Sequence, residues 1–166
     1  MSESMSTDGV RLRDRLRDPD ARVELLLFRV GAEQFAVALS AVEEALDLAG
    51  ATVHDDVPGR ASSLLGVLDL RGALVPLHRA SALLGLPASP VETALVMRVA
   101  GGRLALGVDD AEDVLTVRVG DLRPAPHLDA SRALLGVVQQ GKDLIGVLDG
   151  EVLVAACRPD PSLETS

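Results

Sequence analysis

The stretch FRVGAEQFAVALSAVEEAL, residues 28–46, lies over MRVAGGRLALGVDDAEDVL, residues 97–115, without a gap. Most apolar residues of one segment match apolar residues of the other, and charged residues match as well. Glu43, for example, lies on Glu112, which comes 69 positions later in the chain. Similarity at one fixed offset indicates a structural unit that occurs twice.

A second block of similarity follows in the same order. Residues 64–67 and 134–137 both spell Leu-Leu-Gly-Val, at an offset of 70 positions. The glycines Gly72 and Gly141 come next and are 69 positions apart. Blocks that keep their order at nearly one offset predict two copies of a unit of about 69 residues.

Each copy consists of short apolar runs that are separated by brief, mostly glycine-bearing intervals. The predicted strands are Glu24–Val30, Gln34–Leu39, Val67–Leu70, Ala73–Leu77, Leu95–Val99, Arg103–Val108, Val137–Gln139 and Leu144–Leu148. The intervals are too short for crossover helices, so adjacent runs are predicted to pair antiparallel. Short strands with tight glycine turns indicate an all-β fold, either a sandwich or small barrels. Because a unit of five strands is marginal alone, we expect the two copies to share a core.

Helical structure is expected at only a few places. Ser40–Glu43 and Asp109–Glu112 resemble capping boxes, so a helical turn is predicted to start at each. Ser81–Leu84, followed by Gly85, predicts another turn of helix. Residues 10–16 are the one part of the N-terminal segment that favours a helix.

The ends of the chain differ in composition from its middle. Residues 1–22 contain five Arg, five acidic residues and few large apolar side chains, which predicts a flexible charged tail. A single folded domain is predicted over 23–157, with internal repeats over about 23–90 and 91–157. Residues 158–166 are predicted to form a C-terminal tail.

Composition excludes several classes of function. The chain has 166 residues, of which 48% are hydrophobic, so it can bury a core without disulfides or metal. Two Phe and no Tyr or Trp leave few platforms for stacking nucleobases, and a net charge of -9 repels nucleic acids and anionic membranes. No segment has the roughly 20 apolar residues of a membrane span, no secretory signal begins the chain, and Cys157 has no disulfide partner. These features predict a cytoplasmic protein that neither binds nucleic acid nor inserts into a membrane.

No set of residues predicts catalysis or metal binding. His54, His78 and His127 are isolated from one another and from the cysteine, so each is expected to be a loop or strand-end side chain. The acidic pairs Asp55-Asp56 and Asp109-Asp110 are typical of solvated turns or helix starts. No nucleophile elbow, phosphate loop or dinucleotide fingerprint is present. We therefore expect a non-enzymatic protein without cofactor or metal.

One charged residue stands out because of its surroundings. Residues 64–77, LLGVLDLRGALVPL, are almost continuously apolar and are interrupted only by Asp69 and Arg71. In one interpretation Arg71 lies at the tip of a hairpin, where Gly72 provides the turn. In the other, Arg71 is a rigidly presented guanidinium that pairs with a carboxylate across an interface. Spacing alone leaves both interpretations open.

The order of these fragments resembles CheW-like domains, the adaptors of bacterial chemotaxis arrays, over residues 23–157. The residues that carry the resemblance are Phe28 through Phe35 to Glu44, Val57-Pro58, Leu65-Gly66-Val67, Asp69-Leu70-Arg71-Gly72, Val75-Pro76, Val108-Asp109 through Val114-Leu115, Arg123-Pro124-Ala125-Pro126 and Leu135-Gly136-Val137. Each fragment alone is a weak signal, whereas their joint order and spacing are specific. The resemblance implies two five-stranded, SH3-like β-barrels about a pseudo-twofold axis, with short helical turns.

The resemblance also implies a non-enzymatic scaffold that couples chemoreceptors to a CheA-type histidine kinase. In that family one barrel joins the kinase regulatory domain, and a groove near the first barrel takes the cytoplasmic tip of a receptor. The Leu-Arg-Gly segment, here Leu70, Arg71 and Gly72, is important in that coupling, and Val42 and Glu44 match residues on the receptor side.

The chain departs from the family pattern after Val75-Pro76, where Leu77-His78 is followed by Arg79-Ala80-Ser81 instead of the usual Asp-Leu-Arg. Such departures concern the partners more than the fold. Two alternatives therefore remain: a divergent CheW-like regulator that does not bind the kinase, and a β-barrel module that binds a small ligand.

Overall fold

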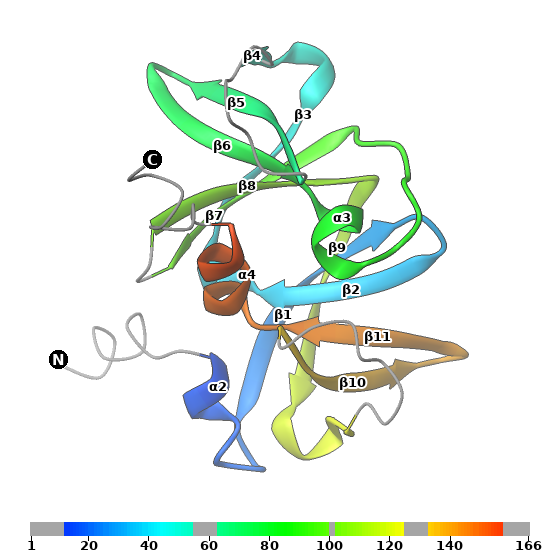
Figure 1. Ribbon diagram of the computed structural model, residues 1–166. Coiled ribbons are helices and arrows are strands. Elements are labelled where there is room, and N and C mark those ends of the chain that lie inside the picture. Colours follow the sequence, from blue (N-terminus) through cyan, green and yellow to red (C-terminus); the bar gives the residue numbers. More distant parts are fainter. Residues whose placement is uncertain (1–11, 55–62, 100–101, 125–132, 158–166) are drawn as a thin grey trace, which may run out of the picture.

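The computed structural model describes residues 12–54, 63–99, 102–124 and 133–157, which form two antiparallel-rich sheets (Figure 1). The five-stranded sheet has the order β10 (Leu134–Gln140), β11 (Asp143–Leu148), β2 (Glu33–Ala38), β1 (Arg22–Val30) and β9 (Asp110–Arg118). The six-stranded sheet has the order β3 (Val42–Asp47), β7 (Thr93–Val99), β8 (Gly102–Val108), β6 (Ala73–Arg79), β5 (Leu64–Leu70) and β4 (Thr52–His54). The predicted all-β fold of two subdomains is confirmed, with β4 as an additional strand in one of them.

The two copies of the repeat exchange their N-terminal hairpins. The β1–β2 hairpin of the first copy pairs with β9 and β11 of the second. In return, the β7–β8 hairpin of the second copy pairs with β3 and β6 of the first. Both exchanged hairpins join one neighbour antiparallel and the other in parallel, so the two sheets have equivalent connections. Each subdomain is therefore built from both copies.

A shared core lies where the two sheets face each other. It contains apolar side chains of β1 and β2 from one sheet and of β7 and β8 from the other. Phe28 and Phe35 stack with their ring centroids 6.1 Å apart, and Leu95 and Met97 are fully buried against the same cluster. Each sheet also encloses a smaller cluster of its own, one centred on Leu25 and the other on residues of β5 to β8. The expectation of a core common to both copies is thus met.

Two short helices close the shared core. Helices α3 (Ala80–Leu84) and α4 (Gly150–Ala156) follow equivalent strands in the two copies and lie near the middle of the molecule (Figure 1). The predicted helical turn at Ser81–Leu84 is correct, and it ends at Gly85, whose φ of 70° favours glycine. Buried Leu84 and Leu153 carry the two helices into the core.

Of the two helical turns predicted from capping boxes, the one at Ser40–Glu43 is met only in part, and the one at Asp109–Glu112 is wrong. A 3₁₀ helix of three residues, η1 (Leu39–Ala41), precedes β3, but the chain is already extended from Val42. Asp109 is followed directly by β9, without helix. In both cases the backbone groups pair with a strand of the other copy, β7 or β1, and this ladder outweighs the local capping preference.

The N-terminal segment carries a short helix where one was expected, α2 (Leu12–Arg15). Leu12 packs into the cluster around Leu25 together with Val23 and Val117. Residues 1–11 lie outside the described part of the chain, as do His127 and the Asp55-Asp56 pair that the sequence singled out. Among the described residues, no helix has the length and apolar character needed to cross a membrane.

One buried position differs between the copies in polarity. The hydroxyl of Ser63 lies 2.8 Å from Nδ1 of His78, and both residues are buried. The amide of Arg79 donates to the carbonyl of Ser63, and the amide of Asp149 donates to that of Ala133. These bonds match Ser63 with Ala133 and His78 with Leu148. Burial lowers the pKa of His78 below 6.5, so the ring is neutral at physiological pH.

We expect the double variant Ser63→Ala/His78→Leu, which installs the apolar pair of the second copy, to be at least as stable as the wild type. Both polar partners leave together, so no group is left unpaired. Since the unfolded chain protonates His78 more readily than the folded one, the wild type loses stability as the pH falls below 6.5, and the double variant should lack this loss. Urea unfolding at about pH 7 and about pH 5 measures both effects.

The single variant His78→Leu is the control. It leaves the buried hydroxyl of Ser63 without its partner and should be about 1 kcal/mol less stable than the double variant. An acid-induced loss in the double variant as large as in the wild type would assign that loss to other groups.

Candidate functional site

The β5–β6 hairpin turns at Arg71 and Gly72, which are the two residues between the paired Leu70 and Ala73. Both turn residues have positive φ, 52° for Arg71 and 91° for Gly72. This is the two-residue turn whose twist matches that of a β-hairpin. The carboxylate of Asp69 accepts a hydrogen bond from the amide of Gly72 at 2.9 Å. The one Asp and one Arg in the apolar run thus together form the turn.

Arg71 occupies a conformation that glycine adopts with less strain. In the second copy the pair Gln140–Asp143 brackets the corresponding turn, so its first residue, Gly141, matches Arg71. Gly141 has a φ of 63°, close to that of Arg71. The expected match of Gly141 with Gly72 is therefore wrong by one residue. A side chain at such a φ costs free energy, so Arg71 is not explained by the turn alone.

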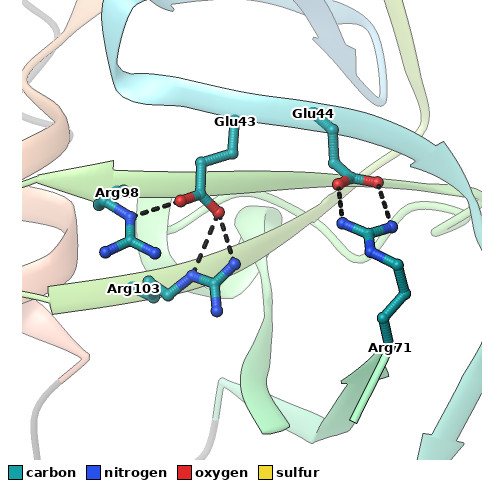
Figure 2. A network of polar contacts seen from close by, with 5 residues as sticks. All are labelled: Glu43, Glu44, Arg71, Arg98 and Arg103. Carbon is teal, nitrogen blue, oxygen red and sulfur yellow. Dashed lines mark hydrogen bonds and ion pairs between the residues drawn. The ribbon is translucent and has the colours of Figure 1, made fainter. Parts of the chain in front are cut away.

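The guanidinium of Arg71 binds the carboxylate of Glu44, which lies on β3 (Figure 2). Its two terminal nitrogens donate to the two carboxylate oxygens at 2.7 and 3.5 Å. The bond from Arg71 lowers the pKa of Glu44, and Glu44 in turn raises the pKa of Arg71. The side chain of Arg71 is 72% exposed and that of Glu44 is 33% exposed. The pair is therefore charged, joined by two hydrogen bonds and accessible from solvent.

The adjacent Glu43 makes a different contact: its side chain points toward Arg98 and Arg103, whereas that of Glu44 points toward Arg71 (Figure 2). The register of β3 against β7 shifts between Val42 and Glu44, so Glu43 lies at a bulge. Its carboxylate accepts hydrogen bonds from Arg98 and Arg103, the latter at 2.7 Å. Both arginines belong to the β7–β8 hairpin of the other copy.

The second copy repeats the contact of Glu43 but not that of Glu44. Glu112 on β9 binds Arg29 at 3.2 Å and Gln34 at 3.0 Å, and both partners lie on the exchanged β1–β2 hairpin. The residue that matches Glu44 is Asp113, whose carboxylate accepts a bond from the amide of Val114 instead. The contact made by Glu43 therefore occurs in both copies of the repeat. The Glu44–Arg71 pair occurs in one copy and so distinguishes the two subdomains.

The other predicted site residues take supporting positions. Leu70 is 6% exposed and belongs to the cluster inside the six-stranded sheet. Val42 is half-buried and packs against the shared core. Gly72 is exposed on the turn. Of the five residues predicted for partner binding, the structure brings Glu44, Arg71 and Gly72 to the surface and places the other two beneath it.

The sequence did not identify one exposed residue beside this turn. Leu74 is 65% exposed on β6, and the equivalent Leu144 on β11 is 62% exposed. Both hairpins thus present a leucine to solvent near their tips. The sequence offered no signal for Leu74, because polar and apolar residues do not alternate within the apolar run from residue 64 to 77.

Replacing Arg71 by glycine tests whether the turn requires arginine. We expect Arg71→Gly to fold and to melt at a temperature at least as high as the wild type, because glycine fits the positive φ. The reverse change at the matched turn, Gly141→Arg, should lower stability by about 1 kcal/mol. Thermal unfolding followed by circular dichroism measures both, and a lower melting temperature for Arg71→Gly would make the arginine structural.

Removing the carboxylate of Glu43 tests the contact between the copies. We expect Glu43→Gln to lower the unfolding free energy by about 1 kcal/mol near neutral pH. The bonds from Arg103 and Arg98 lower the pKa of Glu43 below 4.5, so its contribution is present above pH 4.5 and is lost as the pH falls through the folded-state pKa. The variant should therefore lose less stability on acidification than the wild type. Glu33→Gln, an exposed change on β2, is the matched control.

Comparison with known proteins places this geometry in a family. A chemotaxis protein CheW of Rhizobium meliloti is 36% identical over 108 residues, which cover 63% of this chain and 68% of that protein. A probable chemotaxis protein CheW of Rhizobium etli is 32% identical over 136 residues, covering 78% and 86% of the two chains. The crystal structure of the scaffolding protein TtCheW from Thermoanaerobacter tengcongensis matches with a TM-score of 0.68 at 16% identity, over 78% of this chain and 90% of that one. The model of the CheW-like domain matches residues 24–158, and the chain belongs to the CheW-like domain family.

Proposed function

We propose that this protein is a cytoplasmic, non-enzymatic adaptor that couples chemoreceptors to a CheA-type histidine kinase. Membership of the CheW-like family supports the proposal, as do relatives named as chemotaxis proteins and a structural neighbour named as a scaffolding protein. The proposal rests on the surfaces that the domain presents to its partners.

The observation that carries the proposal is the Glu44–Arg71 pair. Arg71 keeps a backbone conformation in which the second copy has glycine, and its guanidinium is nevertheless held in place by Glu44. A cation that is fixed in direction and largely exposed suits recognition of a carboxylate on a partner protein. We assign the receptor-coupling surface to Glu44, Arg71 and Gly72, with Val42 and Leu70 as its support.

The exposed leucines provide the apolar part of such contacts. Leu74 lies on the strand that follows the Arg71 turn, and Leu144 occupies the same place on the other subdomain. A domain with one exposed leucine at each hairpin can contact two neighbours at once. Contacts of modest area then suffice, because an array multiplies weak contacts through effective concentration. A signal would pass as a change in the relative geometry of bound domains, without a chemical step.

Reconstitution of receptor-containing membranes with the kinase and this protein tests the proposal. We expect the wild type to bind the isolated kinase regulatory domain with micromolar or tighter affinity and to support receptor-stimulated autophosphorylation. The Arg71→Gly variant should retain kinase binding and lose most of the receptor-stimulated autophosphorylation. The change removes the guanidinium, while glycine fits the conformation of the turn. Phosphate incorporation from labelled ATP measures the stimulation.

Arg29→Ala is the matched control, since it removes an arginine from the contact with Glu112 on the other subdomain. Equal loss of stimulation in both variants would place coupling elsewhere than at Arg71. A folded wild-type protein that does not bind the kinase regulatory domain would contradict the adaptor assignment and favour a CheW-like regulator outside kinase coupling. Melting shifts with common metabolites, in the absence of any protein partner, would instead favour a ligand-binding module.

A further inference from the structure

The two subdomains differ in how the outer edge of their hairpin is covered. In the six-stranded sheet, β4 pairs with β5 over three residues, and Thr52, Val53 and His54 oppose Asp69, Leu68 and Val67. In the five-stranded sheet, the equivalent cover of β10 among the described residues is a single bridge between Arg123 and Val137.

The difference has a cause in chain length. In the first copy, three residues lie between the end of the 3₁₀ helix η2 (Leu48–Gly50) and His54. In the second copy, one residue lies between the end of η3 (Val119–Asp121) and the bridging Arg123. Among the described residues, the shorter connection meets β10 at Arg123 alone.

One residue of β10 is thereby left with backbone groups that face outward. The amide and carbonyl of Val137 both bond Arg123, so they point to the outer edge of the strand. Alternate residues of a strand point the same way, so the amide and carbonyl of Gln139 also face outward. Their counterparts on Asp69 lie opposite Thr52 of β4 in the six-stranded sheet, whereas no strand of the described chain pairs with Gln139 on this side.

A pocket of about 650 Å³ lies at this uncovered edge. Residues Val137–Gln140 of β10 form one wall and Leu115–Arg118 of β9 form the other. Leu144 also lines the pocket and is 62% exposed there. The pocket thus combines an open strand edge with an apolar side chain, which are the elements of a site for a short extended peptide.

The charge of the residues that line the pocket indicates the charge of the peptide that it would bind. Arg22, Arg118 and Arg123 line it, although the whole chain has a net charge of -9. Arg22 and Arg118 lie directly opposite each other in the β1–β9 ladder, an arrangement of like charges that destabilises a sheet. Among the described residues, two carboxylates offset this in part. Asp121 lines the pocket, and Asp20, 88% exposed, lies 3.5 Å from Arg118.

We propose that this pocket binds a short extended segment of a partner protein that carries acidic side chains, and that the segment takes the place that β4 occupies in the other subdomain. The backbone of the segment pairs with Gln139, and its carboxylates pair with Arg22 and Arg118. This site lies on the five-stranded sheet, away from the Glu44–Arg71 turn, and it does not depend on the proposed coupling function.

The test uses the full chain and a fluorescent peptide of alternating glutamate and valine, with binding followed by anisotropy. We expect saturable binding that weakens as salt is added, and no binding of the matching lysine–valine peptide. Arg22→Gln/Arg118→Gln should weaken binding about tenfold, since two charge pairs with the peptide are lost. Arg17→Gln, an exposed change that removes one positive charge and does not line the pocket, should have an effect of less than about twofold.

A second variant tests the backbone contact. Gln139→Pro removes an outward-facing amide, and because proline is tolerated at strand edges we expect the variant to fold, which its melting curve checks. It should bind the acidic peptide several-fold more weakly at unchanged charge. The Arg22→Gln/Arg118→Gln protein should itself melt no lower than the wild type, because two opposed like charges are removed.

The proposal is overturned by any of five results, of which four concern the peptides and the variants. These are absence of binding up to about 1 mM peptide, equal binding of the lysine–valine peptide, equal weakening by Arg17→Gln, and unchanged binding in a folded Gln139→Pro protein. Equal binding of a short single-stranded DNA would likewise overturn it, because the pocket would then select anions in general and not an extended peptide.

Discussion

The hydrogen-bond ladders between exchanged hairpins are the contacts on which the rest of this structure depends. The β1–β2 hairpin completes the sheet of the second copy, and the β7–β8 hairpin completes that of the first. Without these ladders neither copy closes around its apolar cluster. The shared core of Phe28, Phe35, Leu95 and Met97 would then not be enclosed. The Glu43 and Glu112 contacts then fix each hairpin against the third strand of the other copy. The symmetric part of the molecule follows from this one exchange.

Function is expected where that symmetry is broken. The first copy has arginine at a turn that suits glycine, and it adds Glu44 to hold the guanidinium. The second copy has glycine at this turn but carries a shorter connection beside β10, which leaves a pocket lined by arginines. Two nearly equivalent subdomains thus present different chemistry, one a fixed ion pair and the other an open edge. We propose that these two surfaces serve different partners.

Much of the fold could be predicted because the repeat and the glycine turns are local signals. The runs around Gly31, Gly72 and Gly102 became hairpins as expected, and the all-β class followed from their spacing. The hairpin exchange could not be predicted, since antiparallel neighbours look alike whether a third strand comes from the same copy or the other. The same ladders overrode the capping boxes. Arg71 was found as a candidate, but its pairing with Glu44 requires two strands to meet across 27 positions of sequence.

The exchange also bears on how the molecule comes apart. Each sheet takes strands from both halves of the chain, so neither subdomain can lose its strands while the other keeps its own. We therefore expect both subdomains to unfold together in one cooperative transition when the protein is heated or denatured. A break of the chain between Leu86 and Glu92, which connect α3 to β7, would leave two fragments that each lack part of both sheets. Such fragments regain structure only in each other's presence, as complementary halves of a single fold.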